Sequence, residues 1–437
     1  MQTSFPDSLS KLSSCLRAGK ISASEVVAEY LRRSEQKDSK VKAWACLAAE
    51  QARDEAAGLS KASTTPASLG PLGGIPFGVK DIYDTAGIPT EWGSPLCRGH
   101  IPSADAELVA ELRQAGAVML GKNHTTAFAF FDPGPTRNPY NLAHTPGGSS
   151  SGSAAAVAAG MVPFALGSQT MGSVLRPASY CGVTGLKPTF GGLSTKGVLP
   201  FAPSLDHCGL FTRTVEDMSF LWSALGNQAG DPSAKTKLAL MPWPPRGKLD
   251  PEMEQGMREC RRRLVSGGVV VDTIALPESF AALPDATQTV LRFEAAATHA
   301  ERFRRHGERI GAHLARLVQD GLDTERKDYE TALRTIERCR LDFSRLGAGF
   351  PVWLTPAALG PAPKGLASTG DPICNAPFTA LGVPALALPF GLSKDGLPLG
   401  LQLAAPSGRE DLLLSAGRVC ERILGVLPRP RLGNPAL

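Results

Sequence analysis

The stretch PGGSSSGSAAAVAAGMVPFALGSQTMGS, residues 146–173, sets the pattern for the whole chain. Residues 151–160 are small and predict a helix that packs closely against a neighbour. MVPFALG, residues 161–167, follows as a short apolar run typical of a buried strand. Because helices and strands alternate in this way through much of the chain, the sequence predicts an α/β fold, with a sheet covered by helices on both faces.

Further helices and strands are expected outside this stretch. Residues 22–25 form a capping box, which predicts the start of a helix. The charged region from about 250 to 346 predicts long helices and is interpreted as an insertion or a flanking lobe. The other expected elements are amphipathic helical segments at 41–59, 104–115 and 410–424, and strands at 75–80, 117–120, 269–274, 383–389 and 397–405.

The composition excludes several classes of function. The net charge of +5 is spread without a long block of one sign, so neither a nucleic-acid groove nor a polybasic membrane anchor is indicated. The nine cysteines contain no C-x-x-C pair and the seven histidines no H-E-x-x-H, which indicates a reduced, metal-free protein of the cytoplasm. The most apolar segment, 154–166, is shorter than the roughly 20 residues that span a bilayer.

Three consecutive serines raise the question of a nucleophile. G-S-S-S-G at 148–152 fits G-x-S-x-G, the pattern of a nucleophile elbow, with Ser150 as the nucleophile. An elbow requires a buried strand directly before the serine, whereas the preceding residues NPYNLAHTPGG are typical of a loop. It also requires a histidine base, and His144 and His207 are lone histidines of the kind that is more often structural.

Ser173 is better placed to act as the nucleophile. It follows the predicted buried strand and precedes residues 174–189, which predict a short helix and a turn rich in Gly and Pro. Successive backbone N–H groups are therefore expected beside it, and such groups can stabilise the oxyanion of an acyl transfer.

A lysine stands at the end of another predicted strand. In LGGIPFGVKDI, residues 72–82, alternating apolar residues lead to Lys80. A charged lysine among apolar residues costs free energy, so Lys80 is either paired with Asp81 or Asp84 or held neutral to act as a base. Lowering its pKa from about 10.4 to near 7 corresponds to roughly 4 to 5 kcal/mol. On this segment alone, the ion pair is favoured.

Together these segments resemble the amidase signature family of Ser-Ser-Lys hydrolases. The matching pieces are GGIPFGVKD at 73–81, the stretch 146–189, and ALGVPALALPFG with GLPLGLQLAAP near the C-terminus. The resemblance implies a large, mixed, twisted sheet in a single domain, 1–437. Its expected parts are N-terminal helices at 1–65, a catalytic core at 66–240, a variable helical region at 241–350 and the C-terminal part of the core at 351–437.

The resemblance also implies roles for individual residues. By position, the nucleophile is Ser173, the bridging serine after a cis peptide bond is Ser149, the base is Lys80, and Ser150 is a supporting residue. A proton can then pass from Ser173 through Ser149 to neutral Lys80 during attack on the carbonyl. The oxyanion hole is expected from the N–H groups of Thr170, Met171, Gly172 and Ser173. No cofactor and no metal are implied.

The chain departs from the commonest family pattern, G-T-D-T-G-G-S-I-R, at three positions. Gln169 stands where aspartate is usual, Met171 where glycine is usual, and Leu175 where arginine is usual, with Arg176 one step later. The aspartate and arginine are hypothesised to form a pair in typical members and to have been replaced together. A side chain at Met171 is expected to narrow the site or to require a different backbone angle.

The sequence therefore predicts a hydrolase of an amide, anilide, carbamate (urethane) or ester bond in a small apolar or aryl substrate. Phe128, Phe131 and Gln169 are expected to line the substrate site, although a buried strand ending in a turn is an equal alternative for residues 128–135. Two other functions stay open: the A-type component of a tRNA-dependent glutamine amidotransferase, and an inactive binding homologue. A monomer or a homodimer is expected.

Overall fold

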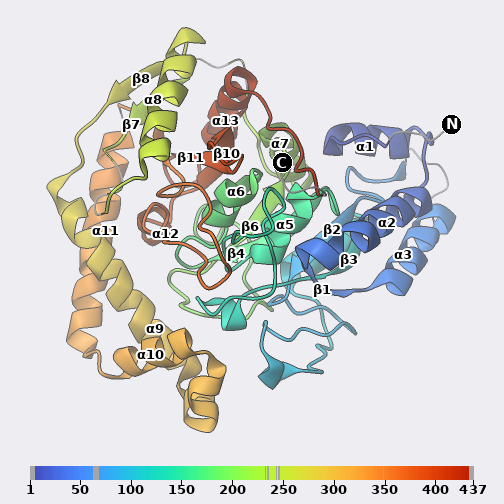
Figure 1. Cartoon of the computed structure of the whole chain (residues 1–437), viewed down its shortest axis with the longest axis horizontal. Coiled ribbons are helices and arrows are strands. Elements are labelled where there is room, and N and C mark those ends of the chain that lie inside the picture. Colours follow the sequence, from blue (N-terminus) through green and yellow to red (C-terminus); the bar gives the residue numbers. More distant parts are fainter. Residues whose placement is uncertain are drawn as a thin grey trace.

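The computed structural model describes residues 5–62, 68–231, 233, 236–242, 244, 247–347 and 349–432. In these ranges one sheet of eleven strands is flanked by helices (Figure 1). The strands are β1 Trp44–Leu47, β2 Pro76–Lys80, β3 Val118–Asn123, β4 Phe164–Gln169, β5 Thr184–Lys187, β6 His207–Thr212, β7 Lys237–Leu240, β8 Val270–Thr273, β9 Val352–Pro356, β10 Ala385–Leu392 and β11 Pro398–Ala404. The α-helices are α1 Leu9–Arg17, α2 Ala23–Val41, α3 Ala49–Ala62, α4 Glu107–Gln114, α5 Ser151–Ala158, α6 Leu175–Cys181, α7 Val215–Ala224, α8 Pro251–Ser266, α9 Leu283–His306, α10 Ala312–Leu322, α11 Arg326–Gly347, α12 Ala376–Ala380 and α13 Glu410–Leu424.

The sheet is mixed, in the order β1-β3-β2-β4-β6-β5-β10-β11-β9-β7-β8. The pairs β2/β3, β2/β4, β7/β8 and β7/β9 are parallel, and the remaining neighbours are antiparallel. The expected α/β architecture, a large mixed sheet covered by helices, is confirmed.

Helix α5 lies inside the molecule, against the sheet and beside α6. All of its residues are buried, and it contacts β2, β3, β4 and β6. Small side chains permit this close approach, because a Cβ added at Gly152 would lie 2.3 Å from the carbonyl oxygen of Ala43. The expected small-residue helix is therefore present, and it holds the serines of its N-terminal loop over the sheet.

The lysine and serine segments meet because β2 and β4 are parallel neighbours. Val79 lies opposite Leu166 in this pair. Lys80, at the end of β2, is therefore beside the last residues of β4. The carboxyl ends of adjacent parallel strands share one edge of a sheet, and residues at that edge commonly form binding sites.

The region 241–350 is tied to the sheet. Its strand β8 pairs with β7, while α10 and α11 each pack on α9 (Figure 1, lower left). Helix α9 also contacts α12 and so reaches the carboxyl-edge loops. In the described ranges, no helix combines the length and the apolar character needed to span a bilayer.

The expected helical stretch at 41–59 is wrong in its first half. Helix α2 ends at Val41, residues 44–47 form β1, and α3 begins only at Ala49. Strand β1 exists because it pairs with β3, a contact that local periodicity does not record. The capping box is confirmed, since Ser22 Oγ accepts from the N–H of Glu25 and the N–H of Ser22 donates to the Glu25 carboxylate.

Candidate active site

Lys80 is fully buried at the end of β2 and faces two serines. Its Nζ donates to Ser149 Oγ at 2.7 Å and to Ser168 Oγ at 2.8 Å. The favoured ion pair is wrong, because Asp81 pairs with a different buried lysine, Lys122, at 3.5 Å. Burial lowers the pKa of Lys80 from 10.5 to about 7, so a large fraction of its amine is neutral at neutral pH.

Ser149 and Ser150, which are neighbours in the serine loop, make different contacts. The peptide bond between Gly148 and Ser149 is cis, as the resemblance implies, and the Ser149 hydroxyl bonds to Lys80. Ser150 instead donates to the carbonyl oxygen of Ser168 at 3.1 Å and accepts from its N–H at 3.1 Å. Ser150 therefore ties the loop to β4, which is the geometry of a supporting residue.

The turn after β4 presents free backbone donors. Among the described residues, none accepts a hydrogen bond from the N–H groups of Met171, Gly172 or Ser173. Ser173 lines the same small pocket as Ser149. The turn is held from one side by Thr170, whose hydroxyl donates to Asp206 at 2.6 Å. A hydroxyl beside several free N–H groups is the arrangement that an oxyanion hole requires.

Gln169 supports this turn from within and does not line the substrate pocket. Its side chain is fully buried, and Oε1 accepts from the N–H groups of Val174 and Leu175 at 2.9 and 3.0 Å. Its Nε2 donates to Thr379 Oγ1 at 2.9 Å. The prediction that Gln169 contacts substrate is therefore wrong. Leu175 is also fully buried, so neutral side chains occupy both positions at which typical family members are hypothesised to carry a charged pair.

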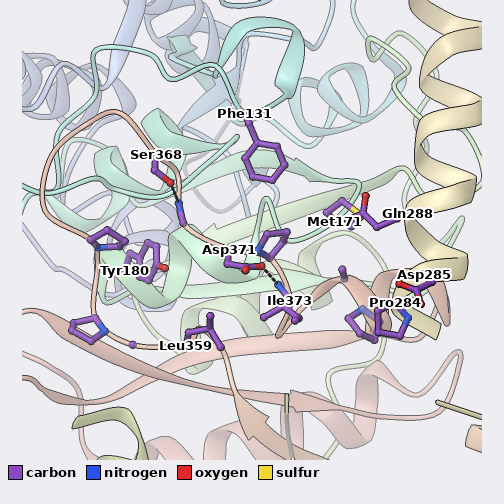
Figure 2. Close-up of a pocket in the computed structure, with 17 residues that line it drawn as sticks. Phe131, Met171, Tyr180, Pro284, Asp285, Gln288, Leu359, Ser368, Asp371 and Ile373 are labelled. Carbon is purple, nitrogen blue, oxygen red and sulfur yellow. Dashed lines mark hydrogen bonds between the residues drawn. The ribbon is translucent and has the colours of Figure 1, made fainter. Parts of the chain in front are cut away.

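Two cavities with shared lining residues lie at this turn, and the serines line the smaller one. The small pocket has a volume of about 20 Å³ and is lined by Ser149, Ser173 and Arg176 together with aromatic side chains. The larger cavity, about 750 Å³, is walled by prolines, apolar residues, Ser368 and Asp371 of the 359–373 loop and by the start of α9 with Asp285 (Figure 2). Phe131 and Met171 line both cavities. Met171 therefore lies where the two cavities share a wall, and narrowing of the site by its side chain stays a prediction.

The two phenylalanines expected in the site differ in position. Phe131 lines both cavities, but Phe128 is fully buried and packs against Trp92 and His299, at ring-centroid distances of 6.4 and 6.1 Å. Neither cavity is lined by Phe128, so its expected role is wrong. Residues 128–135 form no strand either, because Ala127–Ala129 is a single 3₁₀ turn followed by bends.

Arg176 is a site residue that was not expected from the sequence. It is 2% exposed and lines the small pocket, and its Nη2 donates to Gly148 O and Thr369 Oγ1 at 2.7 and 3.2 Å. Its Nε and Nη1 have no hydrogen-bond partner among the described residues. Burial lowers the pKa of Arg176 to about 10, so it stays charged at neutral pH. In the sequence, only its position three residues after Ser173 could have indicated that Arg176 lies in the site.

Histidines and metal-binding clusters do not take part in this pocket. His207 Nδ1 lies 2.7 Å from Leu205 O, and the residue lines another cavity, of about 90 Å³, which shares Ala129, Thr170 and Phe201 with the small pocket. Burial lowers the pKa of His207 well below its usual range. All nine cysteines are free, and the described ranges hold no group of three or more His, Cys, Asp or Glu suited to a metal ion.

A family model, a curated sequence and two solved structures that resemble this chain belong to amidases or to an amidotransferase component. The sequence model of a family described as Amidase matches residues 25–414. The A-type component of the glutamyl-tRNA(Gln) amidotransferase of Shouchella clausii is 36% identical and covers 96% of this chain and 97% of its own. The crystal structure of an amidase shares 30% identity with a TM-score of 0.88, over 96% of this chain and 100% of its own. The native peptide amidase from Stenotrophomonas maltophilia shares 26% identity with a TM-score of 0.82, over 99% and 100%.

Proposed function

The chain belongs to the amidase family, and we propose that it hydrolyses a carbon–nitrogen or ester bond through an acyl-enzyme on Ser173. The observation that carries the proposal is the hydrogen bond between the buried amine of Lys80 and Ser149, a serine that lines the same pocket as Ser173. A lysine with a pKa of about 7 is suited to general base catalysis near neutral pH.

The proposed proton route combines the hydrogen bond between Lys80 and Ser149 with the pocket that Ser149 shares with Ser173. As Ser173 Oγ attacks the carbonyl carbon, its proton passes to Ser149 Oγ, and the Ser149 proton passes to Lys80 Nζ. The N–H groups of the turn stabilise the oxyanion. When the bond to the leaving group breaks, Ser149 gives its proton to the departing nitrogen or oxygen and recovers one from Lys80. Water then attacks the ester on Ser173 by the same route and releases the acid.

The pocket favours a substrate that carries an anion. A buried guanidinium without a carboxylate partner is costly, and the unpartnered Nε and Nη1 of Arg176 are charged donors, each able to bond one oxygen of an anion. Because Arg176 and Ser173 line the same small pocket, we propose a carboxylate close to the scissile bond. The centre of the Phe131 ring lies 5.7 Å from the guanidinium carbon of Arg176. This ring gives the proposed anion subsite an apolar wall that suits an aryl group.

Paired substrates test this assignment. p-Nitroanilides, p-nitrophenyl esters and aryl carbamates would be prepared with a carboxylate on the acyl part and with a methyl group in its place. We expect Arg176→Gln to lower kcat/KM for the carboxylate series by about 100-fold, or about 2.7 kcal/mol, and for the methyl series by much less. The matched control is Arg213→Gln, because Arg213 is a buried arginine that donates to Gly182 O away from the pocket. Equal losses in both series would refute the anion subsite.

A second function is favoured by the names of the curated relatives. The A-type components of amidotransferases, at 32–36% identity, cover nearly the whole chain. Glutaminase activity that appears only when the other amidotransferase components and transfer RNA are supplied would support that role. An inactive binding homologue is excluded if a fluorophosphonate labels the protein and Ser173→Ala abolishes the label.

A further inference from the structure

Two buried neutral side chains connect the carboxyl end of β4 with helix α12. Thr379 is fully buried, and its hydroxyl donates to the carbonyl oxygen of Met171 at 2.9 Å. The same hydroxyl oxygen accepts from Gln169 Nε2 at 2.9 Å. A continuous chain of hydrogen bonds therefore runs from Gln169 through Thr379 to the turn that holds the free N–H groups.

The stereochemistry of the peptide bond gives this contact a consequence. In a trans peptide, the C=O of one residue and the N–H of the next point in opposite directions. Holding the Met171 carbonyl toward Thr379 therefore directs the N–H of Gly172 away from α12. That N–H has no acceptor among the described residues, so it is available to an oxyanion.

The other end of the Gln169 amide acts on the far side of Ser173. Its Oε1 accepts from the N–H groups of Val174 and Leu175, which follow Ser173 directly. One side chain thus holds the backbone after Ser173 and, through Thr379, the backbone before it. An aspartate at 169 offers only acceptors when ionised, so it would attract the Thr379 proton that Met171 O now receives.

We propose that Gln169 and Thr379 are positioning residues that align the oxyanion donor of Gly172 with the Ser173 hydroxyl. This inference rests on the proposed function, in which Ser173 is the nucleophile. The amide and the hydroxyl form a neutral relay, in which every donor faces an acceptor. Neither side chain touches the substrate, so the relay affects the transition state more than substrate binding.

Thr379→Val tests the relay, because valine keeps the shape of threonine and removes the hydroxyl. We expect kcat to fall about 10- to 100-fold with KM changed less than about threefold, since loss of a whole oxyanion donor costs about 10²–10³. Thr379→Ser retains the hydroxyl and should keep kcat within about threefold. Gln169→Glu should lower kcat like Thr379→Val, and the double variant should lose little more than either single one.

Thr212→Val is the matched control. Thr212 is a fully buried threonine whose hydroxyl donates to Thr214 O, and it pairs with Phe164 at the opposite end of β4 from the site. Its kcat should be unchanged. An equal loss of kcat in Thr212→Val, an equal loss in Thr379→Ser, or an unaltered kcat in Thr379→Val would each overturn the relay. Absence of fluorophosphonate labelling of Ser173 in the unsubstituted enzyme would instead refute the proposed function.

Discussion

The pH dependence of hydrolysis should follow the protonation of Lys80. Burial lowers its pKa from 10.5 to about 7, a shift worth about 5 kcal/mol. At pH 7 an unshifted lysine would be neutral in about 0.03% of molecules, whereas about half of the Lys80 side chains are neutral. Because only the neutral amine can accept the proton, kcat/KM should rise about tenfold per pH unit up to pH 7 and then level off. About 1% of the plateau value should remain at pH 5.

Lys187 provides the control for this assignment. It is a second fully buried lysine whose pKa is lowered by burial to about 7, but its Nζ donates to the carbonyl oxygens of Pro188 and Val383. The assay is kcat/KM for a p-nitrophenyl ester from pH 5 to 9, corrected for active enzyme by fluorophosphonate titration. Lys80→Met should lose at least about 10³-fold at every pH, whereas Lys187→Met should keep the acid limb. A flat profile in the unsubstituted enzyme, or loss of the limb in Lys187→Met, would show that Lys80 is not the base.

Three further substitutions have defined outcomes. In Gly172→Ala, the new Cβ would lie 2.7 Å from Asn375 Oδ1, so the turn or the Asn375 side chain must shift. We expect the turn to shift and kcat to fall about 100-fold while the circular dichroism spectrum stays native. Met171→Ala should raise the kcat/KM of naphthyl over phenyl substrates by about tenfold, and an unchanged ratio would show that Met171 does not limit the site. Lys122→Met leaves Asp81 buried without its charged partner and should lower the free energy of unfolding in urea by about 3–5 kcal/mol. A decrease below about 1 kcal/mol would contradict a structural ion pair.

Local sequence patterns predicted the parts of the site that lie within continuous segments. The strand leading to Lys80, the small-residue helix after the serines and the turn at Ser173 each depend on neighbouring residues, and the structure has all three. The elbow pattern around Ser150 is misleading when it is taken alone. The residues before it form a loop and not the strand that an elbow requires.

Contacts between distant segments were beyond the sequence. Gln169 meets Thr379 across 210 positions, so nothing near residue 169 indicates that its amide serves the backbone. The direction of the Arg176 side chain depends on how α6 docks beside the serine loop. Residues near Lys80 could not show that it has no ion pair with Asp81. That follows only from the contact between Asp81 and Lys122 on the neighbouring strand β3.

The proposed mechanism depends on attack by Ser173 and not by a serine of the 148–152 loop. Intact-mass measurement after fluorophosphonate treatment distinguishes the two, on the unsubstituted enzyme, Ser173→Ala and Ser150→Ala. We predict one covalent adduct on the unsubstituted enzyme and on Ser150→Ala, and none on Ser173→Ala. An adduct that persists in Ser173→Ala and disappears in Ser150→Ala would contradict attack by Ser173.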